Sequence, residues 1–286
     1  MSSQLILSYL YVPGSAPERF AKAEAAGAGA VILDLEDAVG EADKVIARGH
    51  VADHLRTRTA STPQAWVRIN TGERGYADLD AVAGPGLTGV IVPKADSAAQ
   101  LIDLDARLAA LEADLGLPKG RIAVSPLIES GQGLADVDAI AAAPRVTCLQ
   151  LGEVDLAADL GLEPGSDEME LLYARSRVVV ASSAAGIARP VAPVSTEFRD
   201  LEWFTSSTRA LRRLGFFARA CIHPAQLAAV REVFAPSAEE LDAARDILQR
   251  LDAARGGAAV DAAGRMIDEA VARQARRVLA VGERDS

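Results

Sequence analysis

The chain alternates short apolar runs with longer segments in which apolar residues recur at helical spacing. Eight apolar runs are rich in β-branched residues and end at polar turns, the pattern that predicts strands. They cover residues 5–12, 30–33, 65–69, 89–92, 122–128, 146–151, 189–194 and 217–222. Segments with apolar residues three or four positions apart predict helices at residues 15–27, 41–56, 76–83, 97–115, 131–143, 167–185, 201–214 and 224–234.

This alternation of strands and helices predicts the fold class. Parallel strands need a crossover connection, usually a helix, so repeated strand–helix units produce a parallel sheet. Eight such units predict an α/β fold, a (β/α)8 TIM barrel over residues 1–235. An open doubly wound sheet also alternates in this way, but no Gly-x-Gly-x-x-Gly sequence follows the first strand.

Residues 236–286 have a different pattern and predict a C-terminal helical extension. A helix at 238–254 ends at a glycine pair, an extended or hairpin segment covers 258–267, and a last helix covers 269–281. The extension either caps the barrel or packs on a neighbouring subunit.

Acidic residues gather where the predicted strands end. Glu129 follows the fifth strand, Asp155 lies just after the sixth, and Glu36 and Asp37 follow the second, while Arg68 lies near the end of the third. Active sites of such barrels lie at the carboxyl ends of the strands, so these residues are expected at the mouth.

Glu129 and Asp155 follow neighbouring parallel strands and are therefore expected side by side. Mg²⁺ is commonly held by one or two carboxylates together with water and substrate, so this pair predicts a magnesium site. Arg68 would face the cation from the third strand and adapt the site to an oxo acid, or it would pair with the acidic residues in a structural role.

Composition narrows the class of protein further. The formal net charge is −10 and the pI about 4.9, which excludes nucleic acid and an anionic membrane surface as expected partners. No apolar run approaches the ~20 residues of a membrane span. The amino terminus lacks the pattern of a signal peptide, so we expect a cytoplasmic protein. Cys148 and Cys221 lie in predicted strands and are expected to be buried and free.

Nine strings in order carry a resemblance to a known family. They are LYVPGSAPERFAKA, VILDLEDAV, WVRIN, VIVPKADS, PLIESGQGL, GEVDLAADLG, ASSAAGI, GFFARACIHPAQL and GRMID. The chain resembles the citrate lyase beta-subunit branch of the HpcH/HpaI aldolase superfamily over residues 5–280.

The resemblance implies a Mg²⁺-dependent carbon–carbon lyase on a TIM barrel, often a trimer. The reaction it implies is cleavage of citryl-CoA, or a related 3-hydroxyacyl thioester, to oxaloacetate and acetyl-CoA. In this family the residues matching Glu129 and Asp155 bind the metal, and the substrate lies against Glu129 and Arg68. Asp268 matches a residue that reaches an adjacent subunit's site. Glu36, Asp37 and Asp268 are candidates for the general base.

Some positions depart from the family pattern and leave the thioester open. Leu7 and Ala16 stand where relatives usually carry polar or basic residues, and Val154 replaces a frequent acid. Malyl-CoA and citramalyl-CoA are alternative substrates. A metal-dependent 2-oxo acid aldolase, a Schiff-base aldolase using Lys94 and a non-catalytic subunit are alternative functions. Acyl-carrier and transferase subunits, the partners of citrate lyase, are further expected partners if the chain is part of that assembly.

Overall fold

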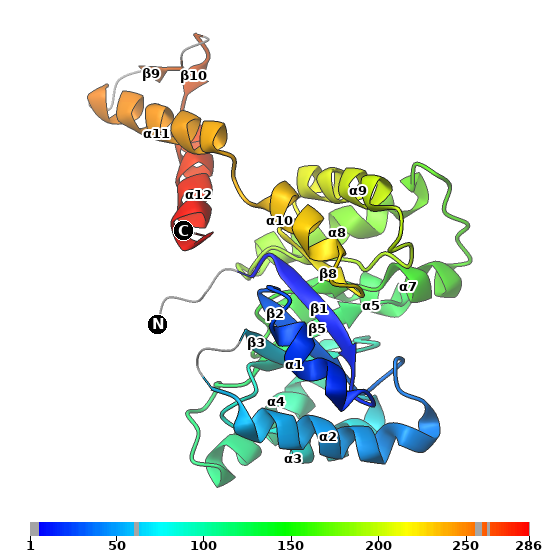
Figure 1. Cartoon of the computed structure of the whole chain (residues 1–286). Helices are drawn as coiled ribbons and strands as arrows, with labels where there is room; N and C mark the ends of the chain where they lie inside the picture. Colours follow the sequence, from blue (N-terminus) through cyan, green and yellow to red (C-terminus); the bar gives the residue numbers. More distant parts are fainter. Residues whose placement is uncertain (1–5, 60–62, 255–258, 262–263, 286) are drawn as a thin grey trace. The chain divides into compact units, whose positions relative to one another are not determined.

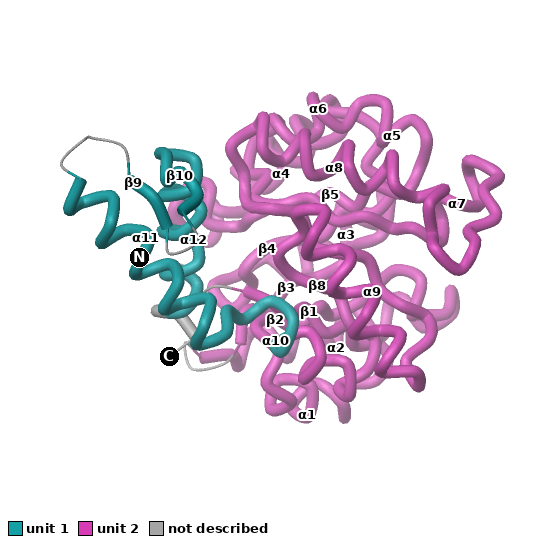
Figure 2. Tube along the Cα trace, turned by 90° about the horizontal axis from the view of Figure 1, so that it is seen from above, with its two compact units in different colours: residues 1–5, 231–286 teal, residues 6–230 magenta. Residues whose placement is uncertain are grey.

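Figure 1 shows the computed structural model, which describes residues 6–59, 63–254, 259–261 and 264–285. The chain divides into two compact units (Figure 2), one of residues 6–230 and one to which the residues from 231 onward belong. Helix α10, Gln226–Phe234, spans the junction between them. The domain boundary at residue 235 stays a prediction.

The predicted (β/α)8 barrel is confirmed. Eight parallel strands pair in chain order, and the eighth pairs with the first to close the barrel. The strands are β1 Ser8–Pro13, β2 Ala30–Asp34, β3 Gln64–Arg68, β4 Gly89–Val92, β5 Ala123–Ile128, β6 Gln150–Leu151, β7 Val191–Ala192 and β8 Ala218–Cys221. Residue 5 of the first predicted strand lies outside the described residues.

Helices surround the strands in the order that the sequence predicts. They are α1 Phe20–Glu24, α2 Lys44–Thr57, α3 Gly72–Val82, α4 Ala98–Asp114, α5 Gly131–Ala135, α6 Val137–Ala141, α7 Glu153–Leu160, α8 Leu172–Ala184 and α9 Leu201–Leu214, with short 3₁₀ turns at Pro17–Arg19, Glu41–Asp43 and Met169–Leu171. The helix predicted at 131–143 is two short helices, because Asp136 leaves the helical region with φ −93° and ψ 8°.

The predicted sixth and seventh strands are longer than the observed ones. β6 is only Gln150–Leu151, although an isolated parallel bridge joins Val124 to Val146 where the predicted strand begins. Short pairing of β6 still brings the carboxyl ends of β5 and β6 together, since Ile128 is in register with Leu151.

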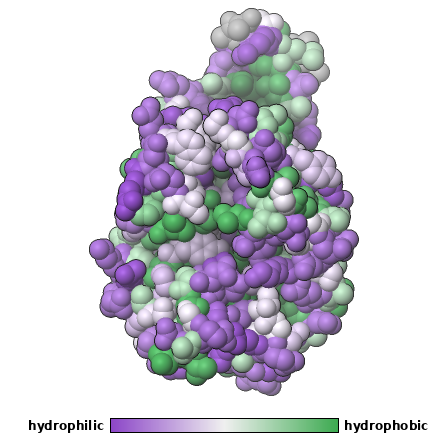
Figure 3. All heavy atoms as spheres, turned by 90° about the vertical axis from the view of Figure 1, so that its right-hand side faces the viewer, coloured by the Kyte–Doolittle hydropathy of each residue, from purple (hydrophilic) through white to green (hydrophobic). Residues whose placement is uncertain are grey.

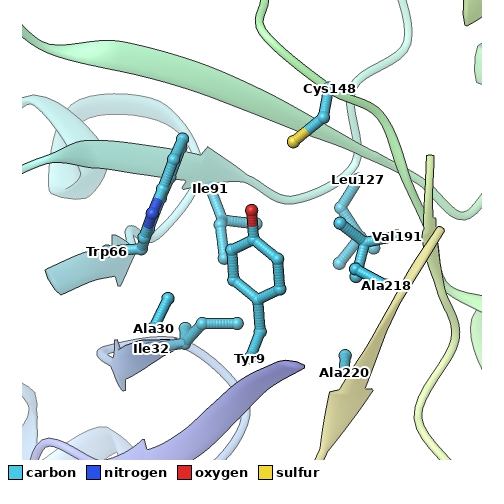
Figure 4. Close-up of a cluster of buried hydrophobic side chains, with 10 residues drawn as sticks. All are labelled: Tyr9, Ala30, Ile32, Trp66, Ile91, Leu127, Cys148, Val191, Ala218 and Ala220. Carbon is cyan, nitrogen blue, oxygen red and sulfur yellow. The ribbon is translucent and has the colours of Figure 1, made fainter. Parts of the chain in front are cut away.

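The barrel interior is filled by side chains from the strands (Figure 4). Tyr9 and Trp66 pack edge to face with ring centroids 6.2 Å apart, and smaller residues such as Ala30, Ala218 and Ala220 leave room for them. Cys148 lies in the same cluster, and both cysteines are buried and free, as predicted. The filled interior restricts ligands to the mouth of the barrel.

The second unit contains the predicted helical extension. Helices α11, Ala238–Ala253, and α12, Glu269–Asp285, pack against each other, and the antiparallel strands β9, Ala259–Val260, and β10, Met266–Ile267, connect them. Among the described residues of the whole chain, no helix has the length and apolar character that crossing a membrane requires.

Candidate active site at the mouth of the barrel

A pocket of about 380 Å³ lies where the strands end. Charged side chains from β2, β3, β5 and α7 line one part of it, and apolar side chains from β7 and β8 line another. Figure 3 views the molecule from the side on which α7 lies in Figure 1. A band of hydrophobic residues crosses the middle of this face beside a hollow, within a mainly hydrophilic surface.

Glu129 lies deep in this pocket, directly after β5. Only 4% of the residue is exposed, and one oxygen of its carboxylate accepts a hydrogen bond from the backbone N–H of Lys94 at 2.6 Å. Lys94 has the left-handed φ of 50°, which is uncommon for a residue with a side chain and directs its N–H to this carboxylate. The turn after β4 is therefore shaped around Glu129.

Asp155 lies beside Glu129 in the first turn of α7 and is itself exposed. We call these two residues the acid pair. The pKa of Glu129 is raised to about 7, mainly by burial; the negative charges of Asp155 and Glu36 also raise it, while the Lys94 N–H and the positive charge of Arg68 lower it. The turn into α7 approaches closely, because a Cβ on Gly152 would lie 2.7 Å from Oε2 of Glu129.

The donor set of the acid pair fits a magnesium ion. Two carboxylates offer hard oxygen ligands, and a cation between them would offset the burial and repulsion that raise the pKa of Glu129. Among the described residues, no group of three or more His, Cys, Asp or Glu side chains is placed to hold a metal. Two protein ligands leave the remaining positions to water and substrate, as Mg²⁺ sites usually do.

Arg68 ends β3 and faces the same pocket. Its guanidinium donates to both carboxylate oxygens of Asp34, from Nε at 2.7 Å and from Nη2 at 2.5 Å, and stacks on the Tyr11 ring with its central carbon 5.2 Å from the centroid. Asp34 is in register with Arg68 on neighbouring strands, which explains the planar two-point contact. This two-point contact with Asp34 fixes the position of the Arg68 guanidinium at the pocket wall.

Glu36 and Asp37 follow β2 and also contact Arg68. Nη1 of Arg68 lies 3.0 Å from Glu36 and 3.2 Å from Asp37. Burial raises the pKa of Glu36, and hydrogen bonding with Asp37 raises it too. Burial acts in the same direction on Asp37, but hydrogen bonding with Glu36 and the positive charges of Arg68 and Lys94 outweigh it and lower the pKa of Asp37. Asp37 therefore holds its negative charge more readily than Glu36.

Lys94 is a rim residue with an acidic partner. Its Nζ lies 3.1 Å from Oε1 of Glu36, and this hydrogen bond is the main reason that its pKa is raised. A raised pKa keeps the amine protonated, whereas a Schiff-base nucleophile needs the neutral amine. The site therefore favours metal chemistry over the Schiff-base alternative.

Asp268 belongs to the other unit and is not among the residues that line this pocket. Its side chain accepts a hydrogen bond from the N–H of Val271 at 2.9 Å, in the first turn of α12. This contact stabilises the helix start, and a role at an adjacent subunit's site stays a prediction.

The structure places Arg68, Glu36, Asp37, Glu129 and Asp155 together at the mouth. It adds the two-point contact between Asp34 and Arg68, a pair that the sequence analysis did not name. This contact could have been predicted, because both residues lie at the carboxyl ends of neighbouring predicted strands. The apolar wall from β7 and β8 gave no such signal, since its residues resemble ordinary core positions.

Fold and site together define an enzyme of the (β/α)8-barrel class whose mouth offers two carboxylates and an arginine. The chain belongs to the HpcH/HpaI aldolase/citrate lyase family, whose model matches residues 7–224. It is 31% identical to citrate lyase subunit beta of Leuconostoc mesenteroides subsp. cremoris, over 97% of this chain and 93% of that protein. It is 34% identical to an L-malyl-CoA/beta-methylmalyl-CoA lyase of Cereibacter sphaeroides, over 96% of this chain and 93% of that protein.

A solved structure extends the similarity to the fold. CitE from Mycobacterium tuberculosis, in complex with magnesium, acetoacetate and coenzyme A, superposes with a TM-score of 0.77 at 35% identity, covering 97% of this chain and 98% of that one. The predicted resemblance is confirmed. Both named relatives are carbon–carbon lyases, and the chain is an enzyme of that class.

Proposed function

We propose that the protein is a Mg²⁺-dependent lyase that cleaves a 3-hydroxyacyl-CoA thioester into an oxo acid and an acyl-CoA. The acid pair beside Arg68 is the observation that carries this proposal. The complex of CitE with magnesium, acetoacetate and coenzyme A supports it, because that relative binds the metal together with an oxo acid and the carrier of the thioester.

The reaction is a retro-Claisen cleavage. A base removes the proton of the 3-hydroxyl, the bond between carbons 2 and 3 breaks, and its electron pair passes into the thioester enolate. Carbon 3 becomes the carbonyl carbon of the oxo acid, and protonation of the enolate at carbon 2 yields the acyl-CoA. Bound Mg²⁺ would supply a Lewis acid and a template for the oxo acid's oxygen atoms.

Arg68 is placed to balance the negative charge of this reaction. Asp34 holds two of its nitrogens, so the guanidinium needs no reorganisation when the substrate arrives. We propose that it binds the substrate carboxylate and stabilises the developing enolate oxygen. Nη1 is not part of the pair of nitrogens that Asp34 holds, and it is the nitrogen that we expect to contact substrate oxygen atoms.

Asp37 is the best candidate for the base among the described residues of the barrel. It lines the pocket with 58% of its side chain exposed, whereas Glu36 has 9% exposed and lies between Arg68 and Lys94. Its lowered pKa keeps it ionised but makes it a weak base, so the access of its carboxylate to the pocket, and not its pKa, is the reason for this choice. Asp268 of a neighbouring copy remains the alternative.

The apolar wall favours a second candidate for the thioester. The family resemblance implies citryl-CoA, whose cleavage gives oxaloacetate with two carboxylates. Ala192, Val194, Ala220 and Ile222 line the pocket on one side, and Arg68 is the only cationic residue among the described ones lining it. A second carboxylate against this wall would lose water without gaining a partner. The oxo acid released from malyl-CoA or citramalyl-CoA is smaller. It has hydrogen or methyl where oxaloacetate carries its second carboxylate arm, so no charged group has to be desolvated against the apolar wall.

A panel of thioesters tests the proposal. The purified full chain is mixed with citryl-CoA, malyl-CoA or citramalyl-CoA and Mg²⁺, and release of the oxo acid is followed. We expect cleavage of at least one thioester, full inhibition by EDTA and recovery with Mg²⁺. Asp155→Asn should lower kcat/KM about a thousandfold, since metal charge stabilisation contributes several kcal/mol.

A matched control separates the acid pair from general loss of charge. Asp138→Asn removes an acid whose side chain is 61% exposed and paired with Arg177, and it should leave kcat/KM within twofold. Cleavage that persists in EDTA, or an Asp155→Asn variant of full activity, would overturn the proposal. The trimer, the citrate lyase partner subunits and the cytoplasmic location stay predictions.

A further inference from the structure

A buried arginine lies behind the acid pair, outside the reaction described above. Arg175 on α8 is 5% exposed and donates to both carboxylate oxygens of Glu153, from Nε at 2.5 Å and from Nη2 at 2.8 Å. Glu153 is the first residue of α7, two positions before Asp155. The two-point contact therefore joins α8 to the turn that carries one member of the acid pair.

Arg175 also holds the segment that connects α7 to α8. Its Nη2 donates to Glu168, within this connection, at 2.9 Å, so one guanidinium joins the start of α7 to the segment that follows the helix. Glu168 has the left-handed φ of 53°, a conformation that costs free energy for a residue with a side chain and needs support from its surroundings. The ion pair with Arg175 provides that support.

Apart from Arg175, the first turn of α7 is held through its backbone, where the N–H of Gly152 donates to the carbonyl of Ile128 at 2.9 Å. Its N-cap residue is Gly152, which has no side chain with which to cap the helix. Gly152 also passes so close to Glu129 that a Cβ there would lie 2.7 Å from the Glu129 carboxylate. A small shift of this turn would therefore change the position of Asp155 relative to Glu129.

We propose that Arg175 is a positioning residue for the acid pair: by holding Glu153 and Glu168 it fixes the first turn of α7, and so the place of Asp155 beside Glu129. This inference rests on the proposed magnesium site. Outer partners of metal ligands typically contribute tenfold to a hundredfold in metal affinity. Arginine is suited to the role because its planar fork holds a carboxylate at two points, which lysine cannot do.

Calorimetric titration of the full chain with Mg²⁺, without substrate, tests the role directly. We expect Arg175→Met to raise the Mg²⁺ dissociation constant about tenfold, and Arg175→Lys to raise it less. The sign is informative: an arginine that acted only through its charge would repel Mg²⁺, and its removal would tighten binding. Arg177→Met is the matched control, because it removes the same charge from the same helix but breaks only an ion pair with Asp138.

A double-mutant cycle identifies the partner. Glu153→Gln should also weaken Mg²⁺ binding, and Arg175→Met combined with Glu153→Gln should be no weaker than the weaker of the two single variants. If the variants displace the first turn of α7 without removing a group that takes part in the chemistry, KM for the thioester should rise by a larger factor than kcat falls. Arg175→Lys keeps the test open if the methionine variant does not fold, as judged by circular dichroism.

The outcomes separate the two proposals. If the unaltered protein shows no Mg²⁺ binding, the proposed function fails. If it binds Mg²⁺ and the folded Arg175 variants bind it equally or more tightly, the positioning role is overturned while the magnesium site stands. Additive losses in the double variant would likewise show that Arg175 does not act through Glu153.

Discussion

Two glutamates at opposite ends of β5 are buried to almost the same extent but have pKa values shifted in opposite directions. Glu112 is 0% exposed and contacts the residues that precede the strand, and Glu129 is 4% exposed and follows it. Burial raises the pKa of both carboxyl groups, since it disfavours the charged form. The difference therefore comes from the partners that each carboxylate has.

The negative charge of Glu112 is balanced by an arginine and by hydrogen bonds. Arg145 donates to both of its oxygens at 2.7 and 2.8 Å, and the N–H groups of Gly120 and Ile122 each donate at 2.8 Å. Burial alone would raise the pKa of Glu112, but these hydrogen bonds and the arginine charge lower it to about 2. Such a group stabilises the fold and has no capacity left for a ligand.

Glu129 has one N–H donor and acidic neighbours instead. Among the described residues, no arginine or lysine side chain forms an ion pair with it, and its pKa is raised to about 7. A buried carboxylate without a cation destabilises the fold unless a cation arrives with the ligand. The comparison indicates which end of the barrel is built for stability and which is built for binding.

Removing the arginine from the compensated end should have the largest effect on stability. Arg145→Met leaves Glu112 buried without its cation, and we expect the free energy of unfolding to fall by about 3–5 kcal/mol. Urea denaturation with circular dichroism measures this loss. The folded fraction should keep its affinity for Mg²⁺, because the change lies at the far end of the strand.

Arg107→Met is the control for that variant. Arg107 lies on the same helix as Glu112, but its ion pair with Asp80 is exposed, with 44% and 43% of the two side chains accessible. We expect little or no loss of stability, because solvent screens an exposed ion pair. Equal losses in Arg107→Met and Arg145→Met would show that burial of Glu112 is not what makes its partner important.

Removing the negative charge of Glu129 should stabilise the metal-free protein. A folded pKa raised from 4.5 to about 7 means that the protonated form stabilises the fold, fully so below pH 4.5, and that this stability is lost as the pH rises through 7. The loss is about 3 kcal/mol at pH 8. Glu129→Gln should avoid it, so in EDTA its melting temperature should exceed that of the unaltered chain at pH 8 but not at pH 5.

Glu112→Gln should change the melting temperature in the opposite direction, and it is therefore the variant to compare with Glu129→Gln. Its pKa is lowered, so its stabilising effect is present above pH 4.5 and is lost as the pH falls towards 2. The variant should melt at a lower temperature than the unaltered chain at pH 8. If both glutamine variants were destabilised at pH 8, the distinction between the two ends would be wrong.

The fold could be predicted because the pattern of strands and helices is local. Parallel β5 and β6 follow from strand–helix–strand order, and that order alone placed Glu129 and Asp155 side by side. The lengths of β6 and β7 could not be read in this way, since apolar residues such as Val146 are buried without joining a regular strand.

The site could be predicted where its residues sit at strand ends, and not where partners meet through packing. Asp34 and Arg68 are paired by register, which sequence order implies. Arg175 meets Glu153 from a helix 22 residues further along, and nothing in the local pattern of α8 distinguishes a buried arginine from an exposed one. Asp268 depends on how copies of the chain assemble, which one chain does not determine.

The smallest effect, and the most specific to Glu129, is the dependence of Mg²⁺ affinity on pH. Mg²⁺ competes with a proton for this carboxylate, so the dissociation constant should rise up to about tenfold for each pH unit below 7 and level off above it. Calorimetry in buffers of different ionisation enthalpy should show about one proton released per Mg²⁺ at pH 5.5 and almost none at pH 8.5. Glu112 stays ionised throughout this range, because its pKa of about 2 lies far below it, so Glu112→Gln should keep the same slope. An affinity that is constant from pH 5.5 to 8.5 would mean that Glu129 is already ionised without the metal, and that the two ends of β5 are more alike than their partners indicate.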